Sequence, residues 1–342
     1  MDNWQEYDNA PEDLVLSSRI RLARNINGIP FPNKLDVASG KEVVNNIEKA
    51  FYTSDEMREN YKSIYLWNND SLQNSKYFEQ HLISPDLINH KDAAAFILNK
   101  DETISIMLNE EDHIRLQAIT GGLNLPECYK MANKLDDKLD ENLDFAFDEK
   151  LGYITACPTN LGTGMRASAM VHLPALTMNN QMNEILKVLT QVGMTIRGLY
   201  GEGTKAQGNL YQISNQITLG YTEEDIITNL EVVVRQVINQ EQATRESLIK
   251  AYKYDIEDKI YRSIGILKNA VLLNSTECLD LLSNVRMGVE LGIIKDVKKG
   301  TLNSLIIDTQ PSTLQSKLNT KLNEKERDIN RARIVKEAFN KV

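Results

Sequence analysis

The stretch from Thr155 to Ser168 constrains the fold more than any other part of the chain. Its sequence, TACPTNLGTGMRAS, joins two apolar runs, 151–156 and 169–171, that are both typical of strands. Cys157-Pro158 would end the first strand, and the two glycines allow a backbone turn that other residues do not. We therefore expect a thiol, free backbone N–H groups and Arg166 at the end of a sheet, which suits an anionic ligand beside a nucleophile.

Two other interpretations of this stretch are open. Gly162-x-Gly164-x-x-Ala167 nearly matches the dinucleotide fingerprint, which needs a helix directly after the loop and an acid roughly 20 positions on. Residues 167–172 are instead typical of a strand, and the acid near that spacing, Glu184, lies in a helical pattern. The fingerprint is therefore disfavoured. A structural turn with a buried cysteine explains these residues alone as well as a functional site does.

Composition limits the class of protein. With 342 residues, 42% of them hydrophobic, the chain is long enough for two domains. The net charge of −9 argues against nucleic-acid binding, and the sequence predicts neither a signal peptide nor a membrane span. Three scattered cysteines fit a reducing cytoplasm, and the four histidines lack zinc-ligand spacing. We expect a cytoplasmic protein without a metal site of its own.

Two arginines alternate with apolar residues near the N-terminus. The run 14–22 is typical of a strand, and Arg19 and Arg21 would share one of its faces. Ile20 and Leu22 would share the other face. Two parallel guanidinium groups suit a polyphosphate. A solvated basic face on an edge strand fits these residue types equally well.

Carboxylates follow two further predicted strands. Residues 93–98 and 103–108 predict a hairpin, after which the chain reads NEEDHIR over 109–115. Glu111 would be a carboxylate base with Arg115 alongside for phosphate, and a solvated turn is the alternative. Residues 195–199 predict another strand, which leads into a loop where Glu202 lies between glycines. Such a loop can close over a substrate, and an ordinary hairpin loop is the alternative.

Phosphoryl transfer is the chemistry that these groups suit together. The chain has neither a Walker A sequence nor the protein-kinase motifs. Five arginines nevertheless lie at or near predicted strand ends, where they would form a cradle for phosphate oxygens. These are Arg19, Arg21, Arg115, Arg166 and Arg197. Glu111, Glu202 and a Cys157 thiolate would then face a cationic acceptor such as a guanidinium, which needs a base to take its proton.

The pattern changes near Gly220. Beyond it the apolar residues recur with a helical period, with one short strand expected around 305–307. We predict a catalytic domain over 1–221 and a mainly helical C-terminal domain over 222–342. His81, in the first of these, lies in a helical pattern with Tyr77, Phe78 and Leu82.

Four motifs, in the same order, resemble the active-site motifs of the phosphagen (guanidino) kinases, such as creatine and arginine kinase. They are Ser18-Arg19-Ile20-Arg21, Asn109-Glu110-Glu111-Asp112-His113, the stretch from Cys157 to Ser168, and the segment from Arg197 to Glu202. The resemblance covers roughly residues 14–220. It implies an α+β fold in which an antiparallel sheet is flanked by helices. It also implies ATP as a substrate, with Mg²⁺ held mainly through the nucleotide.

The resemblance also assigns roles by position. It makes Glu111, Glu202 and Cys157 catalytic, and it leaves open which glutamate is the base and whether the thiol is essential. The positions that it makes ATP-binding are Ser18, Arg19, Ile20, Arg21, Leu22, His81, Arg115, Arg166, Ala167, Ser168, Ala169, Met170, Arg197, Gly198, Leu199, Tyr200 and Gly201.

Two departures point to one branch of this resemblance. Only a short segment precedes Arg19, so the helical N-terminal domain of the metabolic guanidino kinases is missing. The helical tail instead carries Arg327-Asp328-Ile329-Asn330-Arg331-Ala332, which is similar to a motif of the bacterial protein arginine kinases. That family phosphorylates arginine side chains of proteins, serves the stress response and marks proteins for a chaperone-linked protease. The resemblance further implies an activating partner and a homodimer.

The tail motif fits a phosphoarginine side chain. Arg327 and Arg331 are four residues apart on one helix face and would grip the phosphate, while Asp328 meets the guanidinium. Together with Ala332 they form the predicted phosphoarginine site. A solvated helix with internal ion pairs is the alternative. Two rival functions also stay open: a kinase for a free guanidino metabolite, and a non-catalytic adaptor that binds phosphoarginine.

Overall fold

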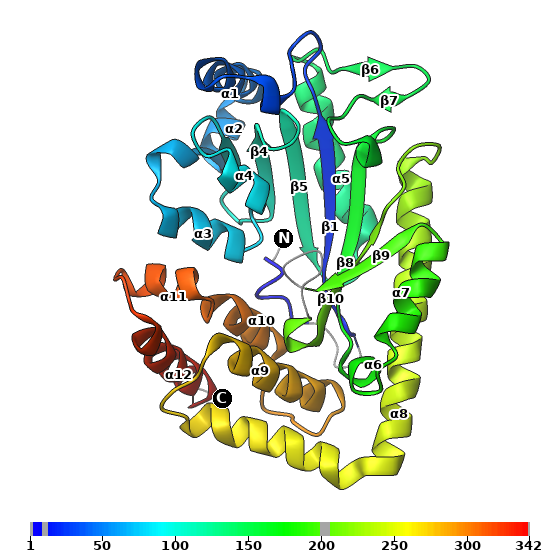
Figure 1. Cartoon of the computed structure of the whole chain (residues 1–342), viewed down its shortest axis with the longest axis vertical. Helices are drawn as coiled ribbons and strands as arrows, with labels where there is room; N and C mark the ends of the chain where they lie inside the picture. The colour runs from blue at the N-terminus through cyan, green and yellow to red at the C-terminus, as the bar shows by residue number, and fades with distance from the viewer. Residues whose placement is uncertain (1–2, 9–12, 199–205, 341–342) are drawn as a thin grey trace.

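An eight-stranded antiparallel sheet forms the centre of the structure, which is a computed structural model that describes residues 3–8, 13–198 and 206–340. Its strands are β1 (Val15–Arg24), β2 (Tyr61–Tyr65), β3 (Ala95–Asn99), β4 (Ile104–Leu108), β5 (Ile114–Gly121), β8 (Met165–His172), β9 (Met194–Gly198) and β10 (Leu210–Asn215). They lie in the order β2-β3-β4-β5-β1-β8-β10-β9 (Figure 1). β6 (Phe147–Asp148) and β7 (Gly152–Tyr153) form a separate ribbon.

Helices surround this sheet and fill the second half of the chain. They are α1 (Val37–Phe51), α2 (Asp55–Asn60), α3 (Ser71–Glu79), α4 (Pro85–Asn89), α5 (Leu125–Asp140), α6 (Pro174–Met178), α7 (Met182–Gln191), α8 (Glu223–Asn269), α9 (Ser275–Glu290), α10 (Lys299–Asp308), α11 (Pro311–Leu318) and α12 (Glu324–Asn340). The expected α+β class, with a flanked antiparallel sheet and a helical C-terminal region, is confirmed.

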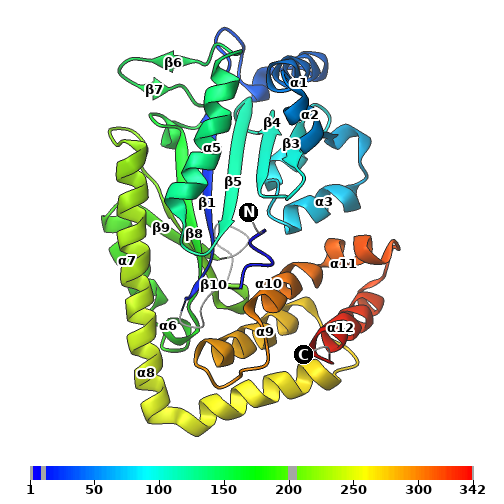
Figure 2. The same ribbon diagram turned by 180° about the vertical axis from the view of Figure 1, so that it is seen from behind.

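One face of the sheet is closed by the main hydrophobic core. Ile20 and Leu22 of β1 point to this face and pack with α1, α5, α7 and the first half of α8 (Figure 2). Because successive side chains of a strand point to opposite faces, Arg19 and Arg21 point to the other face. The predicted division of this strand into an apolar and a basic face is confirmed.

The other face is covered at its two ends and hollow between them. Near β3 and β4, helices α3 and α4 close a small core that includes Leu87 and Phe96. At the opposite end, the second half of α8 with α9, α10 and α12 packs on Leu16, Ile119 and Met170 of the sheet. The arginines of β1 lie between these two covered regions.

Helix α8 runs through both parts of the fold. It begins with a capping box in which Thr222 and Asp225 satisfy each other's backbone N–H groups. Its first half packs in the main core and its second half in the C-terminal core. The helix bends at Tyr252, whose φ of −136° and ψ of 41° are not helical. The bend directs the helix from one core to the other (Figure 1).

A buried ionic cluster fixes the C-terminal helices to the end of β8. Glu290 of α9 accepts hydrogen bonds from His172 (2.8 Å) and Arg286 (2.8 Å) and forms an ion pair with Arg245 (2.9 Å). Arg245 also donates to Glu241, 2.6 Å away. A second attachment lies at α3, where the Glu79 carboxylate accepts from the first backbone N–H groups of α11.

Four local predictions were wrong. Residues 305–307 lie inside α10, which is buried on most sides, so its sequence lacks the polar face that reveals a helix. The strand expected over 151–156 is only β7, because its backbone pairs with the short β6 and with Gly162. A further strand, which the sequence predicts over 210–219, ends already at Asn215. His81 lies beyond the end of α3 with a φ of +61°, outside any helix.

Candidate active site

The hollow face of the sheet holds a cavity of about 410 Å³. Five arginines from four strands meet there: Arg19 and Arg21 from β1, Arg115 from β5, Arg166 from β8 and Arg197 from β9. The strand register explains this meeting, since Arg21 lies opposite Arg166 on β8 and Gln117 on β5. The predicted gathering of all five arginines is confirmed, and Glu111, Cys157, His81 and Gly198 line the same cavity.

Like charges dominate the electrostatics of this cavity. Burial, followed by repulsion from Arg115 and Arg166, lowers the pKa of Arg19 to about 10. Burial and the same arginine neighbours, Arg19 included, also lower the pKa of Arg21. Among the residues that the structure describes, the Arg21 Nε has no hydrogen-bond partner. An anion with several oxygens would relieve this repulsion and fill the open donors.

Neighbouring groups set the direction of the guanidinium groups. Arg19 Nη2 donates to Gln212 Oε1 at 2.5 Å, and Arg166 Nε donates to the Asn215 carbonyl at 3.3 Å. Arg115 forms a buried ion pair with Glu110, whose carboxylate also accepts from the Ser84 hydroxyl. Burial opposes the charge of Glu110, but its pairing with Arg115 outweighs that cost, so the pKa of Glu110 is lowered.

The three consecutive acids have different surroundings. Glu111 lines the cavity half-buried, and burial, then repulsion from Asp112 and Glu110, raises its pKa. Asp112 turns away from the cavity and accepts from the Asn25 side chain (2.6 Å) and the Ala156 backbone N–H (2.7 Å). A half-buried carboxylate with a raised pKa beside buried arginines is suited to take a proton from a bound cation.

The loop that carries Cys157 is held at both ends. Asp112 binds the Ala156 backbone, and the Thr218 hydroxyl donates to the carbonyls of Thr159 (3.0 Å) and Leu161 (2.6 Å). Gly162 has a φ of +109°, and a Cβ there would lie 2.7 Å from the Thr218 carbonyl, so only glycine fits. The Cys157 Sγ lies 3.0 Å from the Thr159 hydroxyl at the cavity wall.

Other predicted positions do not place a side chain in the cavity. Ile20, Leu22, Ala167 and Ala169 pack in the main core. Ser18 donates to the Gly122 carbonyl (2.8 Å) on the same side of the sheet. The remaining predicted loop positions, Leu199, Tyr200, Gly201 and Glu202, lie outside the described residues.

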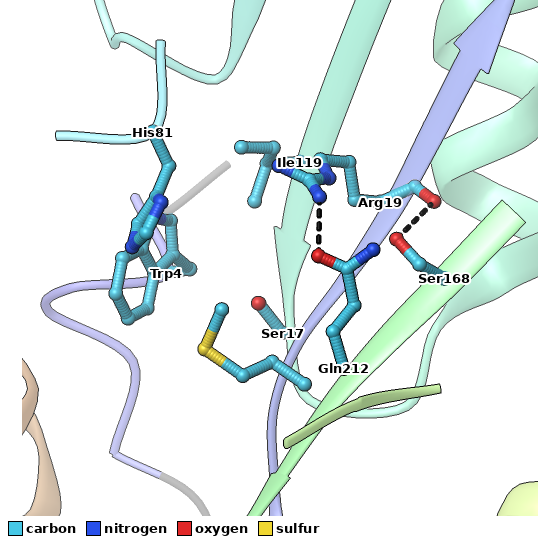
Figure 3. Close-up of a pocket in the computed structure, with 8 residues that line it drawn as sticks. Trp4, Ser17, Arg19, His81, Ile119, Ser168 and Gln212 are labelled. Atoms are coloured by element: carbon cyan, nitrogen blue, oxygen red, sulfur yellow. Dashed lines mark hydrogen bonds between the residues drawn. The ribbon is translucent and has the colours of Figure 1, made fainter. Parts of the chain in front are cut away.

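A second, smaller cavity adjoins the first at Arg19, His81 and Gln212 (Figure 3). Ser168 and Met170 line it together with Trp4, Ser17 and Ile119. Burial, and then the charge of Arg19, lower the pKa of His81 to about 3, so its ring is neutral. This cavity thus combines aromatic and apolar walls with a few hydroxyl and amide groups.

The sequence analysis missed several residues of these cavities. Gln117 lies two residues after Arg115, so the strand period could have found it, whereas Gln212 enters the site by pairing opposite Arg197 of β9. Asp86 and Phe78 come from α4 and α3, which fold over the sheet from a distance in sequence. No pattern in the sequence around Trp4 indicated that it lines a cavity.

The tail motif lies on α12, outside both cavities. Arg331 is only 1% exposed and donates to the carbonyls of Thr309 (2.7 Å) and Leu273 (2.8 Å) as well as to Asp328 (2.6 Å). Arg327 donates to the Leu322 carbonyl at 3.0 Å. Ala332 is buried in the C-terminal core.

The described residues form neither a metal site nor a membrane-spanning helix. No group of three or more histidine, cysteine, aspartate or glutamate side chains among them is placed to hold a metal ion. Within the same part of the chain, no helix combines the length and the apolar character that a membrane crossing requires.

Comparison with known proteins identifies the family. The family described as "ATP:guanido phosphotransferase, C-terminal catalytic domain" matches residues 42–244, and "Protein-arginine kinase McsB C-terminal domain" matches 253–342. Two relatives named protein-arginine kinase, from Clostridium acetobutylicum and Clostridium kluyveri, are each 60% identical over 98% of this chain, covering 99% and 98% of their own lengths. The solved structure of lombricine kinase matches with a TM-score of 0.59 and 26% identity, over 71% of this chain and 70% of its own.

These findings agree with the fold and with the arginine-lined cavity. The chain belongs to the ATP:guanido phosphotransferase family, and the expected resemblance to the bacterial protein arginine kinases is confirmed. The protein is therefore a kinase of the guanido type.

Proposed function

We propose that the protein transfers the γ-phosphate of ATP to arginine side chains of proteins. The observation that carries this proposal is the meeting of five arginines with Glu111 and Cys157 in one cavity. The arginines supply the charge that phosphoryl transfer requires, and the acid and the thiol suit a cationic acceptor. The two Clostridium relatives bear the name of this activity along their whole length.

Each group of side chains in the cavity has its own role in nucleotide binding. Arg19, Arg21, Arg115, Arg166 and Arg197 bind the phosphate oxygens. The segments 18–22, 166–170 and 197–201, together with His81, surround the nucleotide. Mg²⁺, the partner of the nucleotide in the family, screens the phosphate charge. It is held by ATP, because a cavity lined by guanidinium groups repels a free cation.

The chemical step forms one bond and breaks one. A guanidinium nitrogen of the acceptor arginine attacks the γ-phosphorus, the bond from phosphorus to the bridging oxygen breaks, and ADP leaves. Glu111 accepts the proton that the attacking nitrogen loses. Glu202 is the second carboxylate that holds the guanidinium, and the Cys157 thiolate lies beside it. Its own burial, followed by the charges of Asp112 and Glu110, makes Glu111 a stronger base than a solvated glutamate.

Glu111→Gln tests this assignment. We expect the rate of phosphate transfer to fall about 10²- to 10⁴-fold, because the amide cannot take the proton. The protein is incubated with Mg-ATP and an unfolded, arginine-rich acceptor protein, and phosphoarginine is located by mass spectrometry without acid. Phosphate on free arginine alone would favour the metabolic rival. Phosphopeptide binding without any transfer would favour the adaptor. Full activity in the variant would remove Glu111 as the base.

The C-terminal unit is proposed to present the substrate and to bind phosphoarginine. We assign the catalytic domain to 1–221, the helical domain to 222–342, and the phosphoarginine site to Arg327, Asp328, Arg331 and Ala332. Because Arg331 is tied to backbone carbonyls, it would orient Asp328 while Arg327 meets the phosphate. Arg327→Ala should then weaken binding of a phosphoarginine peptide. Arg333→Ala, an exposed arginine of the same helix, should not.

The wider role extends this activity. We propose that the protein works in the cytoplasm as an allosteric homodimer, under an activator protein, in the stress response. There it marks proteins for a chaperone–protease complex. Sedimentation at micromolar concentration tests the dimer. Comparison of phosphoarginine-carrying proteins before and after heat stress, with and without Glu111→Gln in the cell, tests the rest.

A further inference from the structure

Trp4 lies beside the proposed nucleotide site although it comes from the extreme N-terminus. Its ring centroid is 6.0 Å from that of His81, and the side chain is 3% exposed. Figure 3 shows the two rings on one side of the smaller cavity, with Gln212 and Ser168 across from them. Nothing in the chemistry of phosphate binding requires a tryptophan there.

This cavity is small, about 10 Å³, and its lining suits the edge of a planar heteroaromatic group that reaches it from the larger arginine cavity. Trp4, the neutral His81 and the apolar Ile119 and Met170 offer surfaces against which such a ring can pack. Hydroxyl and amide groups of Ser17, Ser168 and Gln212 can meet its polar edge. The cavity also continues into the arginine cavity through Arg19, as a base continues into its phosphates.

The segment that carries Trp4 is fastened to helix α10. Asn303 Nδ2 donates to the carbonyls of Trp4 (3.2 Å) and Tyr7 (3.3 Å), and the Ser304 hydroxyl donates to the Gln5 carbonyl (3.2 Å). The Lys299 backbone N–H donates to Asp8 at 3.1 Å. The backbone approaches closely as well, since a Cβ at Gly300 would lie 2.9 Å from the Glu6 carbonyl.

Helix α10 is in turn held by the C-terminal core. Arg286 of the buried ionic cluster donates to Asn303 Oδ1 at 2.6 Å, which turns the amide nitrogen toward the N-terminal segment. At the end of α10, the Thr309 carbonyl accepts from Arg331 of the tail motif. The position of Trp4 therefore depends on the helical unit as well as on the sheet, where Trp4 packs with Ile119 and Met170.

We propose that Trp4 is a base-binding residue of the nucleotide site, supplied by an N-terminal segment that α10 holds in place. The proposal rests on the proposed function, because it assumes that the arginine cavity takes the phosphates of ATP. It adds a specificity determinant from outside the sheet. The nucleotide pocket is then complete only when the helical unit is packed against the sheet.

Tryptophan fluorescence tests the location directly. The chain has two tryptophans, and the other, Trp67, lies away from both cavities with the Lys41 amine over its ring. In Trp67→Phe, all tryptophan emission comes from Trp4. We expect Mg-ADP to quench this emission with the same Kd that calorimetry gives. Unchanged emission at a calorimetrically saturating concentration would overturn the proposal.

Substitution of Trp4 tests its contribution. Trp4→Ala should raise the KM for ATP about fivefold to a hundredfold, as loss of one base–aromatic contact does, and change kcat much less. Trp4→Phe should restore most of the affinity. An unchanged KM in Trp4→Ala, with nucleotide binding intact, would overturn the role. If the wild-type protein itself binds no nucleotide by calorimetry, the proposed function fails, and the role of Trp4 with it.

A third variant tests whether α10 holds the segment that carries Trp4. Asn303→Asp keeps the oxygen that accepts from Arg286 but loses both donors to the segment. We expect the KM for ATP to rise toward that of Trp4→Ala and the Trp4 emission to shift to longer wavelength. Ser304→Ala, which removes one peripheral hydrogen bond, should have a smaller effect. Equal KM values for Asn303→Asp and wild type, at unchanged melting temperature, would show that α10 does not position Trp4.

Discussion

The protein contains two groups of arginines that differ in how their charge is balanced. In the interior cluster, Arg245 and Arg286 share Glu290 and are joined by Glu241 and His172. In the cavity, Arg115 pairs with Glu110, whereas Arg19 and Arg21 pair with no carboxylate among the described residues. The interior arginines are buried and the cavity arginines are partly exposed, so the two groups differ both in their partners and in their access to a ligand.

The pKa shifts follow this difference at three of these arginines, whereas at Arg286 burial outweighs the charge of Glu290 and lowers the pKa. Burial lowers the pKa of Arg245, but Glu290 and Glu241 outweigh it and raise the pKa above its usual value. Arg19 and Arg21 have arginine neighbours instead, and their pKa values fall. The interior cluster holds its carboxylates in the free protein. Arg19 and Arg21 have no carboxylate partner among the described residues, so a bound anion would supply their counter-charge, which distinguishes a structural use of arginine from a binding use.

Removing the shared carboxylate of the interior cluster should have the largest effect. Glu290→Gln leaves Arg245, Arg286 and His172 buried around a neutral amide. We expect the free energy of unfolding to fall by about 3–5 kcal/mol, as for other broken buried ion pairs. Urea unfolding followed by circular dichroism measures it. Asp258→Asn, from an exposed pair with Arg262, is the control and should cost less than about 1 kcal/mol. Similar losses in both variants would contradict the structural role of the cluster.

Removing a cavity arginine should weaken nucleotide binding without lowering the stability of the free protein. Arg21→Gln relieves repulsion within the cavity, so we expect the free energy of unfolding to stay the same or to rise. Nucleotide binding should weaken by about 1.5–3 kcal/mol, the range for a hydrogen bond to a charged group, which is about 10- to 150-fold in Kd. Calorimetry with Mg-ADP and urea unfolding of the free protein measure the two effects. A destabilised protein with unchanged nucleotide binding would place Arg21 with the structural arginines.

The sequence predicted the cavity better than the interior cluster. The period of two in β1 separated Arg19 from Ile20, and the turn residues located the Cys157 loop, because both signals are local. The partners of Glu290 come from β8, α8 and α9, and no spacing in the chain joins them. Long-range pairing of charges depends on tertiary packing, so it had no signal in the sequence.

The same reason explains the errors in the fold. Helix α10 is so fully buried that its apolar run resembles a strand. His81 leaves the helical pattern because the chain turns there at a φ of +61°, and the Gln117 side chain donates to its carbonyl at 2.8 Å. The place of Trp4 depends on α10, almost 300 residues away in the sequence. Local patterns predicted the elements, and contacts between distant segments decided how they complete the site.

The pH dependence of the reaction should show the smallest effect and examines the Glu111 carboxylate at the wall of the cavity. Under its proposed role, Glu111 must be ionised to accept a proton. Burial, then Asp112 and Glu110, raise its pKa, so kcat/KM should fall with decreasing pH at a higher pH than for a solvated glutamate. The rate of ADP formation, measured over a pH series with a protein acceptor, gives the profile.

Two isosteric variants sharpen this prediction. Asp112→Asn keeps the oxygen that accepts from Asn25 and Ala156 but removes the largest like charge on Glu111, so the acidic limb should move to lower pH. Asp86→Asn removes one negative charge at the cavity wall, where its influence on Glu111 is weaker, and should move the limb less. Because both variants change the net charge equally, a larger shift in Asp112→Asn identifies a local interaction. An identical limb in wild type and Asp112→Asn would mean that the limb reports another group, and the base would then have to be sought elsewhere in the cavity.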